Sequence, residues 1–279
     1  MDKNIINQSF GSVWTNAKLE VIDNYLGFYV TALKKQRFKL CYIDAFAGSG
    51  KVKIKAGDEI DGSAIRALKY GFDRFYFFEK DAIYYNLLQQ RIERDFWDLS
   101  KKVTLKNEDC NDLLMKINEY DWIANRWRGV IFLDPYAMQL SWECLERISK
   151  TKVFDVWYLF PFSAVNRNLY KNVDEIPQAN KDAVTRILGT DDWKNEIYKE
   201  SAQLNLFDQI NYDKEGTDMI RKYIIKRLNN VFPTVSEKAV LLKNEKNSPV
   251  FMLCFAGSNP SQKAKKLSLN AADFILSKL

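Results

Sequence analysis

The stretch CYIDAFAGSG (residues 41–50) begins with apolar residues, passes through one acid and ends in a glycine-rich turn. A continuous apolar run is typical of a strand that is buried on both faces. Glycines after such a strand let the main chain approach a ligand closely, because glycine has no side chain to collide and tolerates positive φ. We therefore expect Asp44, Gly48 and Gly50 in the first loop of a sheet that carries a ligand site.

The composition limits the chemistry of such a site. The chain has 279 residues, of which 47% are hydrophobic, enough for one large domain with a full core. It contains no histidine, which excludes Ser-His-Asp and Cys-His pairs, histidine general bases and metal sites built on imidazole. The net charge of +6 is mild and the basic residues are scattered, which permits a nucleic-acid partner but suits a solvated basic surface better.

Cysteine usage and hydropathy indicate the compartment. The cysteines are far apart, with no C-x-x-C pair: Cys41, Cys110, Cys144 and Cys254. We expect reduced thiols in a cytoplasmic protein. No segment approaches the roughly 18 apolar residues of a membrane span, and the start MDKNIINQSF lacks an apolar run behind a basic head, so we expect neither insertion nor export.

Strand-like and helical patterns alternate along most of the chain. Apolar or β-rich runs occupy residues 40–43, 75–78, 103–105, 129–133, 153–160, 239–242 and 250–255. Helical patterns between the early runs cover residues 63–70, 82–95 and 142–150. This alternation predicts an α/β fold, a doubly wound Rossmann-like sheet that is mostly parallel. The last two strands are close enough in sequence to form an antiparallel pair at one edge.

Two segments depart from this rhythm. Residues 1–36 predict an N-terminal helical extension, because Trp14, Leu19 and Ile22 recur at helical spacing. Residues 168–230 are polar and helical in pattern, which predicts a helical insertion between the fifth and sixth strands. We expect a single domain over residues 1–279 with these two additions.

An acid follows each of the next three strands. Glu79 comes after the second, Asp109 after the third and Asp134 after the fourth. A carboxylate at the second position can bind both hydroxyls of a ribose, and Asp109 falls where an adenine amino group is expected. Any one of these acids is better explained as a helix cap or a surface charge. The series, however, indicates a ligand site at the carboxyl edge of the sheet.

The glycine turn distinguishes between cofactors. Dinucleotide folds use G-x-G-x-x-G to seat a pyrophosphate on a helix N-terminus. Here the glycines are followed by KVKIK (residues 51–55), so the third glycine is absent and no helix begins. S-adenosylmethionine has no phosphate and needs glycines and acids, which this chain supplies.

The motifs DAFAGSG, FFEKD, NEDC and FLDPY, in this order, resemble class I S-adenosylmethionine-dependent methyltransferases. More narrowly, nearly the whole chain is similar to the three-Cys-motif partner (TcmP) family. The similarity is carried by Trp14 with Lys18 and Leu19, YIDAFAGSG, Asp61-Gly-Ser63, FLDPYAMQ and Arg167. It implies a methyltransferase-like protein with a radical-SAM-like three-cysteine partner, and no particular substrate. That family commonly has a glycine where this chain has Ala137; if the glycine supplies a special backbone angle, the turn here is reshaped.

The resemblance also implies a set of cofactor-binding residues, with Asp44 near the methionyl end. They lie in the four motifs: Asp44, Phe46, Ala47, Gly48, Gly50, Glu79, Lys80, Asp109, Cys110 and Asp134.

Asp134, Pro135 and Tyr136 are the expected catalytic residues. They match, with one proline missing, the acid or amide, two prolines and aromatic of amino-directed methyltransferases. There an oxygen accepts a hydrogen bond from the target amino group while the aromatic ring stacks on the base. Alternatively, Asp134 and Pro135 end a buried strand and Tyr136 packs on a neighbouring helix. O-methylation also stays open.

The end of the fifth strand supplies the expected substrate contacts. Phe160 and Phe162 could form an aromatic rim opposite Tyr136, and Arg167 could bind a phosphate or carboxylate. Equally, both rings could be core residues and Arg167 a surface ion pair. The lysines of residues 51–55 suit a protected strand edge better than a flap over the cofactor.

Three functions follow. The first is N-directed methyl transfer to a nucleic acid or nucleobase-like substrate, and the second is a non-catalytic partner that binds S-adenosylmethionine. The third, a nicotinamide-dependent oxidoreductase, is disfavoured by the missing glycine. Neither a metal nor an oligomeric state is predicted.

Overall fold

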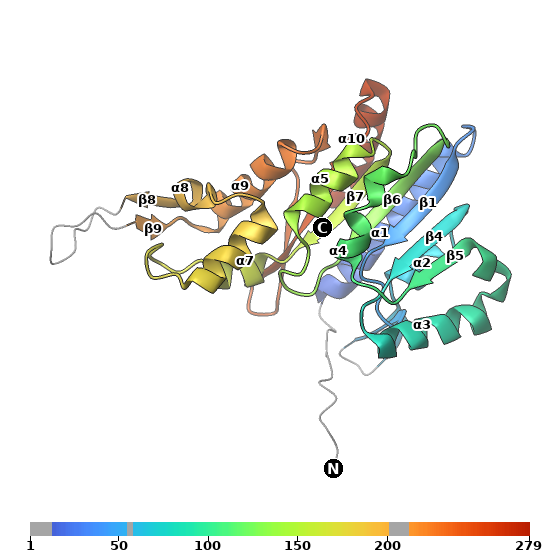
Figure 1. Cartoon of the computed structure of the whole chain (residues 1–279), viewed down its shortest axis with the longest axis horizontal. Coiled ribbons are helices and arrows are strands. Elements are labelled where there is room, and N and C mark those ends of the chain that lie inside the picture. The colour runs from blue at the N-terminus through green and yellow to red at the C-terminus, as the bar shows by residue number, and fades with distance from the viewer. Residues whose placement is uncertain (1–12, 55–57, 201–211) are drawn as a thin grey trace, which may run out of the picture.

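A mixed sheet forms the centre of the molecule, and Figure 1 labels its strands β1, β4, β5, β6 and β7. In this computed structural model, residues 13–54, 58–200 and 212–279 are described. The sheet has the strand order β10-β12-β7-β6-β1-β4-β5, and β11 also pairs with β12. Its strands in chain order are β1 (Lys39–Asp44), β4 (Arg74–Phe78), β5 (Val103–Lys106), β6 (Trp127–Leu133), β7 (Phe154–Phe160), β10 (Thr234–Val235), β11 (Val240–Lys243) and β12 (Pro249–Gly257).

The five strands β7, β6, β1, β4 and β5, in their order across the sheet, are parallel, and β12 is antiparallel to its neighbours. The predicted fold class is confirmed: the chain has a doubly wound, Rossmann-like sheet that is mostly parallel, with an antiparallel portion at one edge. The expected antiparallel pair is β11 with β12. The antiparallel strand β12 does not lie outermost, however, because β10 and β11 pair along its far side.

Successive side chains of each strand point to opposite faces of the sheet, and helices bury the apolar side chains on both faces. One core cluster contains Cys41 and Ile43 and the other contains Leu40 and Tyr42. The first lies under α4 (Cys110–Leu114), α5 (Trp142–Lys150) and α6 (Phe162–Asn168). The second lies under α1 (Val13–Leu33), α2 (Ser63–Ala67), α3 (Ala82–Asp95) and α10 (Gln262–Leu276).

The N-terminal helix α1 is part of the core rather than a peripheral extension. Its Ile22, Tyr25 and Leu26 are fully buried against the sheet, and α1 also contacts α10. Of the helical segment predicted over residues 1–36, residues 13–33 form the helix, residues 34–36 form the turn that follows it, and residues 1–12 lie outside the described part of the chain.

The segment expected to be a helical insertion is helical with one addition. It contains α7 (Gln178–Leu188), α8 (Trp193–Ile197) and α9 (Thr217–Asn229), at the left of Figure 1. Between α8 and α9, the strands β8 (Tyr198–Glu200) and β9 (Tyr212–Lys214) form an antiparallel pair, which corrects the purely helical prediction. Residues 201–211 lie outside the described residues.

Several short elements complete the chain. Strands β2 (Lys51–Lys53) and β3 (Glu59–Asp61) form a separate hairpin in which Lys51 Nζ lies 2.6 Å from a carboxylate oxygen of Glu59. Lys55, at the end of the lysine run, falls outside the described residues. Two 3-10 helices, η1 (Trp97–Lys102) and η2 (Ile117–Glu119), flank β5 and α4.

All four cysteines are free and buried. Within the described ranges, no helix has the length and apolar character needed to cross a membrane.

Candidate functional site

The strand register brings the predicted acids to one edge of the sheet. Asp44, the last residue of β1, pairs with Phe77 of β4 on one side and Phe132 of β6 on the other. Glu79 and Asp134 each follow their strand's paired residue by two positions. The three carboxylates therefore come from adjacent strands at the same carboxyl end, as the sequence predicts.

The glycine turn after β1 has the backbone that its sequence indicates. Gly48 has φ +61° and Gly50 has φ +77°, both in the left-handed region that favours glycine. A Cβ atom on Gly48 would meet nothing within 4 Å, whereas one on Gly50 would lie 2.8 Å from Leu88 and 2.9 Å from Ile65. Gly48 therefore keeps the turn open on its outer side, and Gly50 lets the turn pack against α2 and α3.

Glu79 joins this turn to the end of β4. One of its carboxylate oxygens accepts a hydrogen bond from the Gly48 N–H at 2.8 Å, and the other accepts from the Asp81 N–H at 2.8 Å. Burial raises the pKa of Glu79, against the opposing effect of these hydrogen bonds. A carboxylate has about four acceptor positions, so Glu79 retains acceptor capacity for a ligand hydroxyl.

Asp44 is fully buried beneath the turn. It accepts hydrogen bonds of 3.3 Å from the Tyr42 hydroxyl and from the Phe46 N–H. Burial is the main cause that raises its pKa to about 7, and the charge of Asp134 acts in the same direction. A buried carboxylate in this state gains stability from a cation placed beside it.

Asp109 caps α4 and pairs with Lys80. Its Oδ1 accepts from the Asn111 N–H at 2.9 Å, and its Oδ2 lies 2.8 Å from Lys80 Nζ. Although partial burial opposes ionisation, the bonds from Lys80 and Asn111 lower the pKa of Asp109. Asp109 is therefore a helix cap, as the alternative interpretation expected. Its Oδ1 caps the helix, while its Oδ2 faces the exposed Lys80.

Asp134 forms an ion pair that the sequence did not indicate. Lys18 of α1 binds its Oδ2, and Lys18 Nζ also lies 5.2 Å from the ring centroid of Trp14. Lys18 is only 9% exposed, so the pair is largely shielded from solvent. Among the described residues, Asp134 Oδ1 has no hydrogen-bond partner and stays available. Lys18 belongs to the motif that carries the family resemblance, which is the one sequence signal that could have pointed to it.

The turn after β6 presents Tyr136 to solvent. Tyr136 is 61% exposed, so the alternative in which it packs on a neighbouring helix is wrong. Pro135 is buried, as expected for a residue that ends a buried strand. Ala137 adopts φ +52°, so this turn has the left-handed backbone angle that the family's glycine would supply, without the glycine.

The expected substrate contacts from β7 are not on the surface. Phe160 is 0% exposed because β7 is covered on both faces, and Phe162, the first residue of α6, is 1% exposed and also packs in the core. The predicted aromatic rim is therefore absent in this structure, and the core interpretation of both rings applies. Arg167, on α6, is exposed.

The remaining predicted cofactor residues line the same edge. Ala47 is buried and its N–H donates to the Phe78 carbonyl at 2.9 Å, while Phe46 packs partly on the core. Cys110 is buried at the start of α4, and burial raises the pKa of its thiol.

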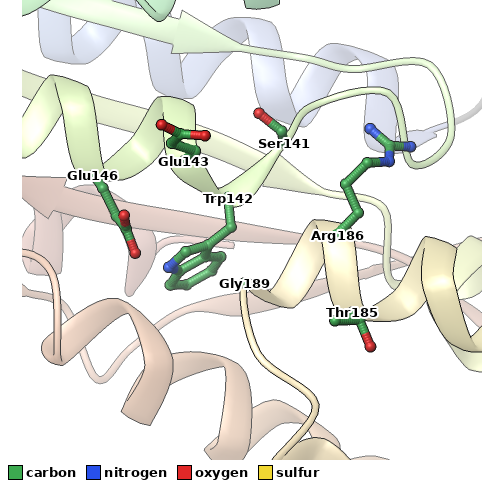
Figure 2. Close-up of a pocket in the computed structure, with 7 residues that line it drawn as sticks. All are labelled: Ser141, Trp142, Glu143, Glu146, Thr185, Arg186 and Gly189. Atoms are coloured by element: carbon green, nitrogen blue, oxygen red, sulfur yellow. The ribbon is translucent and has the colours of Figure 1, made fainter.

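A surface pocket lies elsewhere, between the start of α5 and the end of α7 (Figure 2). Ser141, Trp142 and Arg186 are among its lining residues, and it includes none of the predicted site residues. Arg186 points from α7 towards the turn after β6, where it donates to the Met138 and Gln139 carbonyls. The pocket is therefore separate from the predicted cofactor edge.

No family model matches the chain, and no curated protein matches it in sequence. Solved structures give distant matches. A Legionella pneumophila protein of the DUF519 family has 13% identity and a TM-score of 0.48, with 92% of each chain covered. A candidate S-adenosylmethionine-dependent methyltransferase from Listeria monocytogenes has 13% identity and a TM-score of 0.40, over 83% of this chain and 98% of that one.

The Trm1 protein of Pyrococcus horikoshii, solved with S-adenosyl-L-methionine, has 14% identity and a TM-score of 0.39. The match covers 88% of this chain but only 57% of Trm1. Similarities at this level assign neither a substrate nor an activity to this chain.

Proposed function

We propose that this protein is an S-adenosylmethionine-dependent methyltransferase of the three-Cys-motif partner family. In this proposal it methylates a nitrogen on a nucleic acid or nucleobase-like substrate, together with a radical-SAM-like three-cysteine partner. One observation carries the proposal: Asp44, Glu79 and Asp134 end three adjacent strands around a glycine turn whose Gly48 N–H is bonded to Glu79.

The cofactor would lie across this edge. Glu79 has the free acceptor positions for the two ribose hydroxyls, and the open side of Gly48 allows the main chain to approach the ligand. Asp44 would bind the ammonium group of the methionyl portion, which supplies the cation that a buried carboxylate lacks. Asp109 would contact the adenine amino group.

The target would lie over Asp134 and Tyr136. When bound, S-adenosylmethionine would supply an activated methyl group: the target nitrogen would gain it, the sulfonium would become the neutral thioether of S-adenosylhomocysteine, and the proton lost by the methylated nitrogen would pass to solvent. Asp134 Oδ1 would accept the hydrogen bond from the target amino group, while Lys18 fixes the carboxylate through Oδ2. The exposed Tyr136 ring offers a face for a base. Alignment provides most of the rate enhancement, so the lack of histidine is no obstacle.

Asp134 variants test this assignment. Purified protein with S-adenosylmethionine and a nucleic-acid pool should form S-adenosylhomocysteine. Asp134→Ala should lower that rate by about 100-fold or more, because an acceptor aimed at the target nitrogen is lost. Asp134→Asn keeps an acceptor oxygen and should retain more activity than Asp134→Ala. Both variants should bind S-adenosylhomocysteine with near-normal affinity in calorimetry.

Asp98→Ala is a matched control, because Asp98 is an exposed carboxylate on η1 away from this edge. It should match the wild type. If Asp134→Ala turned over as fast as Asp98→Ala, the catalytic assignment of Asp134 would be wrong.

The second function, a non-catalytic partner that binds S-adenosylmethionine, predicts cofactor binding without turnover. Absence of S-adenosylhomocysteine on every substrate pool, with and without the three-cysteine partner, would favour it. Calorimetry with NAD addresses the oxidoreductase, since tight NAD binding without S-adenosylmethionine binding would contradict both other functions.

A further inference from the structure

Asn111 bridges the two halves of the candidate site. It is the second residue of α4, and its side-chain Nδ2 donates to Asp109 Oδ1 at 2.9 Å and to the Gln139 carbonyl at 3.0 Å. Its Oδ1 accepts from the Ser141 N–H at 3.0 Å and from Cys144 Sγ at 3.3 Å. One amide side chain thus contacts both the expected adenosine end and the turn that carries Tyr136.

The same turn, residues 134–141, has a second anchor that does not reach the cofactor edge. Arg186 of α7 donates to the Met138 and Gln139 carbonyls, and Figure 2 shows its side chain directed towards this turn. The turn also contains the left-handed Ala137. A non-glycine residue is strained in that region, so the turn depends on its anchors to keep this shape.

We propose that Asn111 is a positioning residue that couples cofactor binding at Asp109 to the shape of the turn at residues 134–141. This inference rests on the proposed function and adds a residue with a defined role to it. Through Asn111, a ligand held by Asp109 would order the turn and so place Tyr136 for the substrate.

The coupling follows from the geometry of a single amide. Asp109 Oδ1 can only accept, so it fixes the NH₂ group of Asn111 on its own side. The carbonyl oxygen of the amide must then face Ser141 and Cys144, where it accepts two hydrogen bonds. A ligand that immobilises Asp109 would also restrict rotation of the Asn111 amide. Because that amide holds the turn at residues 134–141, the turn would become less mobile as well.

Two variants of Asn111 separate anchoring from coupling. Asn111→Ala removes every side-chain contact. Asn111→Asp keeps an acceptor for the Ser141 N–H, but it loses the donor to Asp109 and places two carboxylates together. Asn125→Ala is the matched control, because the exposed Asn125 side chain donates to the Asp121 carbonyl within its own turn.

The readout is hydrogen exchange of the peptide covering residues 136–144, with and without S-adenosylhomocysteine. In the wild type and Asn125→Ala, the ligand should slow exchange in this peptide. In Asn111→Ala, exchange should be about tenfold faster without ligand and should no longer respond to it, because the Ser141 N–H loses its acceptor. Asn111→Asp should retain protection at Ser141 without ligand, yet show no response when ligand binds. Calorimetry on each protein gives the ligand concentration that saturates it.

An undiminished ligand response in Asn111→Ala would overturn the coupling while leaving the proposed function intact. A wild-type turn that binds ligand without any change in exchange would do the same. If the wild type bound no ligand at all in calorimetry, the proposed function itself would fall, and the coupling with it.

Discussion

Asp44 is a fully buried acid, and this determines how the site should respond to pH. Burial raises its pKa to about 7. At pH 6 the free protein therefore holds Asp44 mostly protonated, and at pH 8 mostly ionised. A ligand with an ammonium group needs the ionised form, so binding at low pH must release a proton.

We predict that affinity for S-adenosylhomocysteine falls about tenfold per pH unit below 7, as measured by calorimetry between pH 5.5 and 8. Titrations in buffers of different ionisation enthalpy should show one proton released at pH 6. Asp44→Asn should bind more weakly at pH 8 and should lose this pH dependence, because the amide cannot ionise. Identical pH profiles for the wild type and Asp44→Asn would show that Asp44 does not bind the ammonium group.

At the scale of the element, the turn between β1 and β2 uses its two glycines for different purposes. Both have positive φ, but only Gly50 is packed so tightly that a side chain would collide. The Gly50 carbonyl also accepts from Arg91 Nη1 at 2.7 Å and from the Gly62 N–H at 2.9 Å. Gly50 therefore holds the turn in place, and Gly48 leaves room on its outer side.

We predict that Gly50→Ala lowers the free energy of unfolding by several kcal/mol, because the left-handed backbone costs roughly 1–2 kcal/mol and the overlap with Leu88 and Ile65 adds to it. Gly48→Ala should lower the free energy of unfolding only by the cost of the left-handed backbone, yet it should weaken S-adenosylhomocysteine binding more than tenfold. Denaturant titration and calorimetry on both variants measure the two effects. A Gly48→Ala protein with normal affinity would place the cofactor away from this turn.

The regular elements could be predicted from the sequence because their patterns are local. The helix α3 and the strand β6 are examples, since a continuous apolar run or a helical repeat defines each of them. The β8–β9 hairpin was missed because three-residue strands leave too short a pattern. The edge strand β10, with two residues, was missed for the same reason.

The site was only partly predictable, because some of its contacts join distant parts of the chain. The acids at the strand ends follow from the strand pattern, since parallel strands share a carboxyl edge. The Lys18–Asp134 pair spans 116 positions and has no local signature. The bridge from Asn111 to Gln139 also depends on how two loops meet. Phe160 and Phe162 were expected at the site because they come at the end of the predicted fifth strand, but both side chains are buried in the core.

At the scale of the whole molecule, a buried polar pair joins the N-terminal helix to the centre of the sheet. The Tyr25 hydroxyl of α1 donates to Asp155 Oδ2 of β7 at 2.8 Å. Burial raises the pKa of Asp155 to about 7, while Tyr25 and the charge of Arg128 oppose the rise. Asp155 lies at the amino end of β7, far along the strand from the candidate site, so its effect is on stability.

A raised carboxyl pKa makes folding favour the protonated form. The contribution of Asp155 to the stability of the folded protein is complete below its unfolded pKa of about 4, and it is lost as the pH rises through its folded pKa of about 7. We predict that Asp155→Asn changes the free energy of unfolding more favourably at pH 8 than at pH 5.5, and that the two changes differ by about 1–3 kcal/mol. The reason is that the amide keeps the bond to Tyr25 without a buried charge. Thermal unfolding at the two pH values measures this difference.

The exposed Asp98→Asn is the control and should show no difference between the two pH values. Equal changes in Tm for Asp155→Asn at pH 5.5 and pH 8 would mean that Asp155 is ionised in the folded protein throughout this range.

The most direct test of the central claim is a crystal structure with S-adenosylhomocysteine bound. We predict that the ribose hydroxyls contact Glu79, the methionyl ammonium lies beside Asp44, and the sulfur faces Asp134 and Tyr136. A ligand bound away from the carboxyl edge of β1, β4 and β6, or one whose sulfur points away from Asp134, would contradict the assignment of this edge as the methyl-transfer site.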